Sequence, residues 1–147
     1  MKKTVFLVLA IAMVFTACED DDIRNADIPS VVLNGFTEQF SNATGVEWEK
    51  KADLYEAEFE IEKEDYEAIL SSDGTIVKYK YDVSYEALPE AVQASITADY
   101  DKANIDEIEL IQISETSYYQ VEFDAEPNDN KIIFEESGQV TTEITTW

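Results

Sequence analysis

The segment Tyr55–Glu62 reads YEAEFEIE, and a related segment, YQVEFDAE, follows 64 positions later at Tyr119–Glu126. Tyrosine, glutamate, phenylalanine and glutamate occupy corresponding places in the two segments. Apolar and polar side chains alternate along both, which is the period of a β-strand with one buried and one solvated face. The positions predicted to face inward are Tyr55, Ala57, Phe59 and Ile61, then Tyr119, Val121, Phe123 and Ala125.

The similarity extends beyond these strands. Gly74 and Gly138 keep the spacing of 64, and each opens a β-branched run. Upstream, IPSVVLNGFTEQF and LPEAVQASITADY align at a spacing of 60. Each has a proline as its second residue and carries apolar residues every three to four positions, which predicts an amphipathic helix. Because self-similarity at a fixed period indicates a duplicated unit, we predict an α+β fold of two tandem repeats, 28–87 and 88–147, each a helix followed by an antiparallel sheet of about four strands.

The motifs taken together resemble those of a known family. The succession IP..V...F...F, V.WE, YEAEF and a glycine turn, repeated from LPEAV, is similar to the PepSY-like domain of secreted Bacteroidota proteins. That family is likened in fold to the β-lactamase inhibitory proteins. The resemblance covers Ile28 to Thr145. It implies a module of the cell envelope that binds or inhibits a protein or peptide.

The N-terminus has the features of a secretion signal. Lys2 and Lys3 precede an apolar run of 12 residues, Thr4–Phe15, which is shorter than the ~20 residues that a spanning helix needs. The following VFTAC resembles the bacterial lipobox, so residues 1–17 are predicted to be a signal peptide and Cys18 the lipidated residue. A single cysteine in a chain without histidine has no disulfide or zinc partner. We therefore expect an outer-membrane lipoprotein, either periplasmic or surface-exposed.

Residues 18–27 are predicted to be an acidic tether that begins with the cysteine. Its run Glu19, Asp20, Asp21 and Asp22 resembles the export signal of Bacteroidota surface lipoproteins. The alternative is a solvated spacer without a signal function.

The composition restricts the classes of partner. The formal net charge is −23, and removal of Lys2 and Lys3 would leave 8 basic and 33 acidic residues, a net charge of −25. Nucleic acid is excluded because its binding depends on lysine and arginine displacing counterions. An anionic membrane surface is disfavoured too, which leaves the lipid as the only membrane contact. At 45% hydrophobic residues the chain is nevertheless too apolar to be disordered.

The sequence contains no recognisable catalytic motif and no cofactor-binding motif. The absence of histidine excludes a histidine base or a histidine-ligated zinc, and glycine-rich phosphate loops are missing. The glutamates of Tyr55–Glu62 could instead be a docking surface for a basic partner, and Trp48 either an exposed aromatic contact beside them or part of the core. Alternatively they form a solvated sheet face whose charge Lys78 and Lys80 partly offset. The candidate docking glutamates are Glu56, Glu58, Glu60 and Glu62.

The stretch DAEPNDNKIIFE is a candidate calcium loop, because it offers oxygen donors at alternate positions and a glutamate at the twelfth. Asp129 replaces the glycine that such a loop uses for its sharp turn, so a hairpin connection explains the stretch equally well. A calcium- or cation-responsive structural surface lipoprotein is accordingly the alternative function. The candidate ligands are Asp124, Glu126, Asn128, Asn130 and Glu135.

Overall fold

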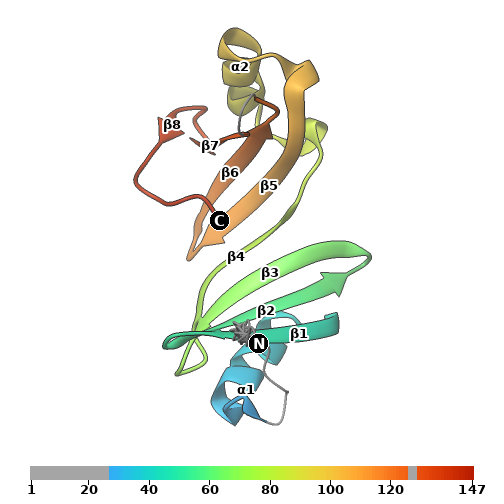
Figure 1. Ribbon diagram of the computed structural model, residues 1–147, viewed down its shortest axis with the longest axis vertical. Coiled ribbons are helices and arrows are strands. Elements are labelled where there is room, and N and C mark those ends of the chain that lie inside the picture. The colour runs from blue at the N-terminus through green and yellow to red at the C-terminus, as the bar shows by residue number, and fades with distance from the viewer. Residues whose placement is uncertain (1–26, 126–128) are drawn as a thin grey trace, which may run out of the picture.

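A computed structural model describes residues 27–125 and 129–147 (Figure 1). The predicted signal peptide, Cys18 and the acidic run Glu19–Asp22 lie outside the described residues. The first half contains α1 (Ser30–Gln39), β1 (Thr44–Lys51), β2 (Leu54–Ile61), β3 (Glu64–Ser71) and β4 (Ile76–Asp82). The second contains α2 (Glu90–Asp99), β5 (Ile105–Ile113), β6 (Thr116–Phe123), β7 (Asn130–Glu135) and β8 (Val140–Thr141).

All the strands belong to one sheet. Its order is β1 to β8, and each strand is antiparallel to the next. The α+β class is confirmed, but the strands do not divide into two separate sheets. β4 pairs with β5 from Tyr79–Gln112 to Asp82–Glu109, which joins the two halves. This pairing satisfies backbone groups that would otherwise be exposed along two strand edges.

The first hydrophobic core lies between α1 and the strands β1 to β4. Phe36 of α1 meets Phe59 at a ring-centroid distance of 4.9 Å and Trp48 at 5.2 Å. Trp48 is only 4% exposed. The prediction that Trp48 contacts a partner is therefore wrong, because α1 covers this side chain and the indole stabilises the core instead.

The second core repeats the arrangement under α2. Val92 and Ile96 of the helix are buried against a cluster that includes Tyr119, Val121 and Phe123 of β6. The predicted inward positions of β2 and β6 are buried, with two exceptions. Ile61, at the end of β2, is half-buried, and Ala125 is exposed because β6 ends at Phe123.

One contact is made twice, at corresponding places in the duplicated sequence. Gly74 and Gly138 have positive φ angles of 86° and 80°. A Cβ added to Gly74 would lie 2.4 Å from the carbonyl oxygen of Val31, and one added to Gly138 would lie 2.4 Å from that of Ala91. In each half, the glycine therefore lets a strand turn approach the helix backbone.

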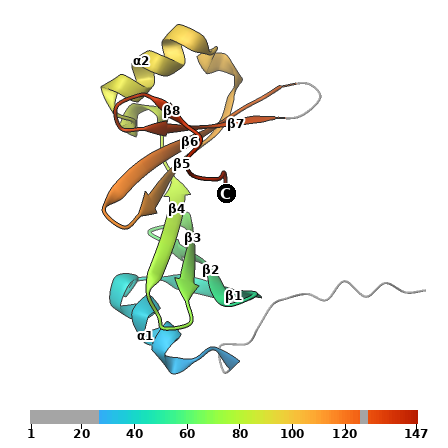
Figure 2. The ribbon, with the colours of Figure 1, turned by 90° about the vertical axis from the view of Figure 1, so that its left-hand side faces the viewer.

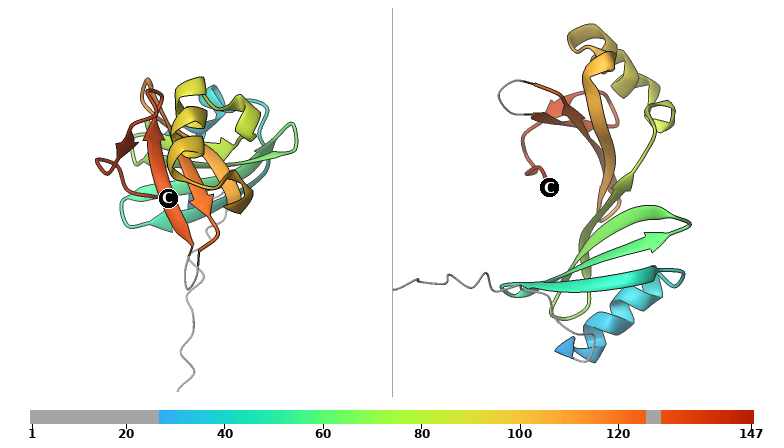
Figure 3. Two further views of the ribbon diagram at one scale, coloured as in Figure 1. Left: turned by 90° about the horizontal axis from the view of Figure 1, so that it is seen from above. Right: turned by 45° about the vertical axis from the view of Figure 1, so that its right-hand side comes forward.

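Both helices pack on the same face of the sheet. Tyr81, Leu110, Tyr119 and Phe134 are successive register partners across β4 to β7, so the two cores are continuous on one side. The helices lie at opposite ends of the molecule (Figure 2). The C-terminal segment runs on the other side of the sheet (Figure 3). Within 27–125 and 129–147, every helix is too short or too polar to cross a membrane.

Candidate functional site

The face of the sheet that the helices leave uncovered, here called the open face, gathers most of the charged strand residues. Successive register partners place Glu58, Glu67, Lys80 and Ile111 in one row across β2 to β5. A second row joins Asp82, Glu109 and Gln120. The polar residues of the open face include Glu47, Glu49, Lys51, Glu56, Glu58, Glu60, Asp65, Glu67, Lys78, Lys80, Asp82, Glu107, Glu109, Gln120, Glu122 and Lys131.

Lys80 connects the two halves on this face. Its Nζ lies 2.6 Å from a carboxylate oxygen of Glu109 on β5 and 3.0 Å from one of Glu67 on β3. Burial by itself lowers the pKa of Lys80, but the hydrogen bonds to Glu109 and Glu67 outweigh it and raise the pKa above its ordinary value. Gln120 donates a short hydrogen bond to the second oxygen of Glu109. At the junction of β4 and β5, Glu67, Lys80, Glu109 and Gln120 thus form a network in which each buried polar group has a partner.

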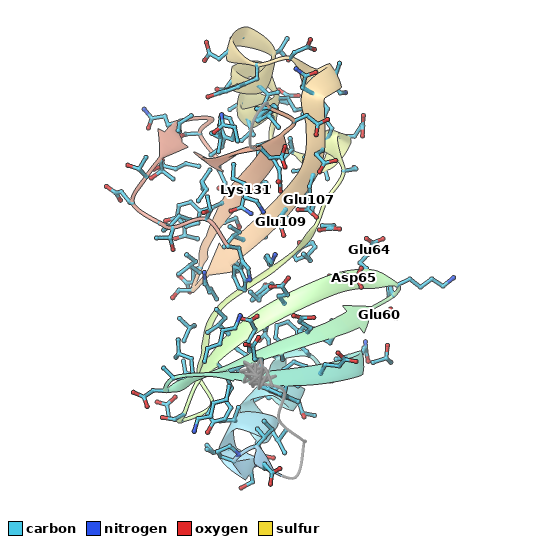
Figure 4. The ribbon with its side chains drawn as sticks, in the orientation of Figure 1. Glu60, Glu64, Asp65, Glu107, Glu109 and Lys131 are labelled. Carbon is cyan, nitrogen blue, oxygen red and sulfur yellow. The ribbon has the colours of Figure 1, made fainter. Side chains whose placement is uncertain are left out.

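An acidic pocket of about 340 Å³ lies next to this network. Figure 4 shows Asp65 near the start of β3 and, on β5 across the junction, Glu107 and Glu109. One carboxylate oxygen from each of Asp82, Glu107 and Glu109 lies within 4.8 Å of the other two. Burial, together with the neighbouring carboxylates, raises the pKa of both Asp82 and Glu107. The charged residues that line the acidic pocket comprise five carboxylates and one ammonium group: Asp65, Glu67, Lys80, Asp82, Glu107 and Glu109.

The glutamates of β2 and of the turn after it do not form the uniform stripe that the alternation predicts. Glu58 and Glu60 are exposed, but Glu56 is only 6% exposed and accepts a hydrogen bond of 2.8 Å from Lys51 Nζ. Glu62 lies beyond β2, in a turn where its φ is 55°. Two causes raise the pKa of Glu58: burial is the larger, and repulsion from the Glu67 carboxylate is the next. Glu58 is therefore the predicted docking residue whose position fits the role best.

Gln120 occupies the place in β6 that Glu56 occupies in β2, and it too is buried, at 1% exposure. Its side-chain oxygen accepts a 2.9 Å hydrogen bond from the backbone N–H of Trp147. The Trp147 ring lies over Lys78, with Nζ 3.9 Å from the ring centroid. Sequence reasoning missed this contact, since no local pattern places Trp147 beside β4 and β6.

The predicted calcium ligands do not come together among the residues that can be described. Asp124 is exposed just beyond β6, and Asn130 and Glu135 stand at the two ends of β7. Five residues of extended chain separate the latter two by about 16 Å, so they cannot bind one ion. Phe123 pairs with Asn130, which makes the stretch a hairpin connection. Glu126 and Asn128 lie outside the described residues.

The comparisons with known proteins agree with this architecture. A family model described as beta-lactamase-inhibitor-like, PepSY-like matches the sequence twice, at residues 14–78 and 71–142. The chain belongs to the PepSY-like family. The two matches overlap at residues 71–78, from the end of β3 to the first residues of β4, so the copies meet at the start of the strand that joins the two halves of this PepSY-like chain.

Solved structures share the fold of the PepSY-like chain. A BLIP-like protein from Bacteroides fragilis is 17% identical, with a TM-score of 0.67 over 81% of this chain and 92% of that one. A DUF2874 family protein from Bacteroides uniformis is 19% identical, with a TM-score of 0.67 over 76% and 85%. A Bacteroides eggerthii protein described as a candidate periplasmic protein is 20% identical, with a TM-score of 0.69 over 76% and 84%. A search of curated proteins gave no match.

Proposed function

We propose that this PepSY-like protein is a non-catalytic module, anchored to the outer membrane through a lipid on Cys18, that binds a protein or peptide partner with the open face. The observation that carries the proposal is the helix-free side of the sheet with its excess of carboxylates. The fold is shared with a protein described as BLIP-like, so inhibition of an enzyme is one form that such binding could take. The lack of histidine in the sequence is in keeping with a binding role rather than a catalytic one.

The charge of the open face favours a basic partner. Lys51, Lys80 and Lys131 are already held in ion pairs with carboxylates. Three other carboxylates, those of Glu58, Asp82 and Glu107, form no ion pair within the described residues, and burial with like-charge repulsion raises the pKa of each. A lysine or arginine placed beside them would relieve that repulsion and would also be steered toward the face by the net negative charge.

Site-specific photo-crosslinking tests whether the open face is the docking surface. A photoreactive phenylalanine derivative is placed at Tyr118, a half-buried open-face position, or at Glu38, an exposed position on α1. After irradiation of intact cells, mass spectrometry identifies the adducts. We expect a reproducible protein adduct from position 118 and none from position 38. Adducts formed from position 38 alone would contradict the proposal.

Once a partner is captured, the effect of a charge on the open face can be separated from the effect of the net charge of the protein. Glu58→Gln and Glu38→Gln each remove one negative charge, but only Glu58 lies on the open face. We expect Glu58→Gln to slow association severalfold at low salt, whereas Glu38→Gln should change the rate much less, since steering depends on charges near the interface. Equal effects of the two substitutions would indicate attraction by net charge without a defined site.

A second candidate is the cation-responsive structural role. It is favoured by the proximity of Asp82, Glu107 and Glu109, each of which has one carboxylate oxygen within 4.8 Å of the other two. Calorimetric titration with calcium separates the two functions. Calcium that neither binds nor raises the melting temperature at millimolar concentration would eliminate this candidate, while leaving the protein-binding proposal intact.

A further inference from the structure

The side chain of Trp147 packs against two lysines of the open face. Its ring centroid is 3.9 Å from Lys78 Nζ and 5.3 Å from Lys80 Nζ. Its backbone N–H donates a 2.9 Å hydrogen bond to the side-chain oxygen of Gln120. The two lysines lie on β4 and Gln120 lies on β6, so these three residues, here called the aromatic site, contact Trp147 from both halves of the sheet.

The chemistry of the aromatic site matches an aromatic residue rather than a charged one. The ammonium groups of Lys78 and Lys80 meet the electron-rich face of a ring, an attraction that strengthens when the ammonium is partly desolvated. Lys78 is such a cation: it forms no ion pair within the described chain, and burial lowers its pKa. A basic side chain would be repelled here, and Gln120 adds a requirement for a backbone donor. The aromatic site therefore favours an aromatic side chain, whereas the carboxylates around it favour a basic one.

The segment that carries Trp147 is weakly attached elsewhere. From Thr142 to Trp147 it forms neither helix nor strand, and Thr142, Glu143, Thr145 and Thr146 are all exposed. Segments with few buried contacts open at low free-energy cost, so Trp147 is the main attachment of this part of the chain. Its release would expose the aromatic site and leave the strands in place.

We propose that the aromatic site is a subsite of the open face that recognises an aromatic residue of the partner, and that Trp147 occupies it in the free protein as an intramolecular competitor. This inference rests on the proposed function in one respect, namely that the partner docks on the open face. A matching partner presents basic side chains to the carboxylates and an aromatic side chain, on extended backbone, to Lys78 and Gln120. Aromatic residues are the side chains that most often anchor protein interfaces.

The subsite can be tested without the natural partner. The probe is a synthetic peptide with the sequence of Thr142–Trp147, added in trans to the full chain carrying Trp147→Ala and followed by NMR of the labelled protein. We expect binding that perturbs Lys78 and the side-chain amide of Gln120, and at least fivefold weaker binding to the unmodified chain, whose site is filled. A peptide with alanine in place of tryptophan should not bind.

Two further variants make the result specific. Adding Lys78→Ala to Trp147→Ala should weaken peptide binding severalfold, whereas adding Lys63→Ala, an exposed turn lysine, should leave it unchanged. If Trp147→Ala proves unfolded by circular dichroism, Lys78→Ala in the otherwise unmodified chain still tests the site, because it should increase acrylamide quenching of Trp147. No peptide binding by folded Trp147→Ala, equal binding by the unmodified chain, or unchanged quenching would overturn the proposal. None of these results depends on the crosslinking from position 118, so the subsite and the proposed function can fail separately.

Discussion

Lys80 on β4 and Glu109 on β5 form a 2.6 Å ion pair where the two halves of the sheet meet. The side chains are only 13% and 5% exposed, and Glu67 and Gln120 complete the hydrogen bonding around them. A charge pair this deeply buried is stable only while both members are present. The pair therefore fixes β5 against β4 and maintains the shape of the open face.

Removal of the Lys80 ammonium should destabilise the protein strongly. Lys80→Met keeps much of the side-chain volume but leaves Glu67 and Glu109 without their cation, and breaking a buried pair in this way costs about 3 kcal/mol or more. Urea unfolding at neutral pH measures the loss. Lys102→Met is the matched control, because Lys102 pairs with Glu86 at 3.7 Å on the surface, where a pair contributes only about 0–1 kcal/mol. Equal losses for the two variants would show that the junction network is not structural.

The turn glycines should be intolerant of a side chain for two separable reasons. Gly74→Ala and Gly138→Ala each impose a positive φ on alanine and push its Cβ into a helix carbonyl at 2.4 Å. Gly45 has a similar φ of 67°, but nothing lies within 4 Å of its added Cβ. Gly45→Ala therefore measures the backbone strain alone, about 1 kcal/mol. We expect both turn variants to lose clearly more free energy of unfolding than Gly45→Ala does.

Moderate acidification should stabilise this protein. Glu58, Asp82 and Glu107 have raised pKa values in the folded state, so below neutral pH the folded chain binds protons that the unfolded chain does not. Stability then rises as the pH falls from about 7 to about 5, toward the ordinary pKa values. The melting temperature at the two pH values checks the sign. In Glu58→Gln the melting temperature should rise less between about pH 7 and about pH 5 than in the unmodified protein. A melting temperature that falls over this interval would contradict the prediction.

The lipid anchor predicts a change of cell fraction. If Cys18 carries the lipid, Cys18→Ala should move the protein from the membrane fraction to the soluble one, because the lipid is the expected membrane contact. Fractionation followed by immunoblotting measures this. Retention of the variant in the membrane fraction would refute lipidation at Cys18.

The acidic run predicts a change of exposure without a change of anchoring. Replacing Glu19–Asp22 with neutral residues should leave the protein in the membrane fraction but protect it from protease added outside intact cells. A variant that is digested as readily as the unmodified protein would favour the spacer interpretation of this run.

The buried positions of β2 and β6 were largely predictable from the sequence, and so were the glycine turns. Alternation of apolar and polar residues identified the inward side chains Tyr55, Phe59, Tyr119 and Phe123, because a period of two fixes the face on which a strand residue lies. The pairing of β4 with β5 was not predictable, since strand partners are chosen by contacts between segments distant in sequence. Trp48 was misassigned for the same reason: its burial depends on α1, not on its neighbours in β1.

By itself, then, the sequence determined the duplication and the face on which each strand residue lies, since both are written in local spacing. Only the tertiary structure decided what covers each face. Glu56 and Gln120 were both expected in solvent, yet both are buried, one beside Lys51 and the other under Trp147. Lys80, too, acquires its buried partners only when β3, β4 and β5 assemble. A repeating pattern can specify orientation, but burial of a polar group depends on partners that folding brings from elsewhere in the chain.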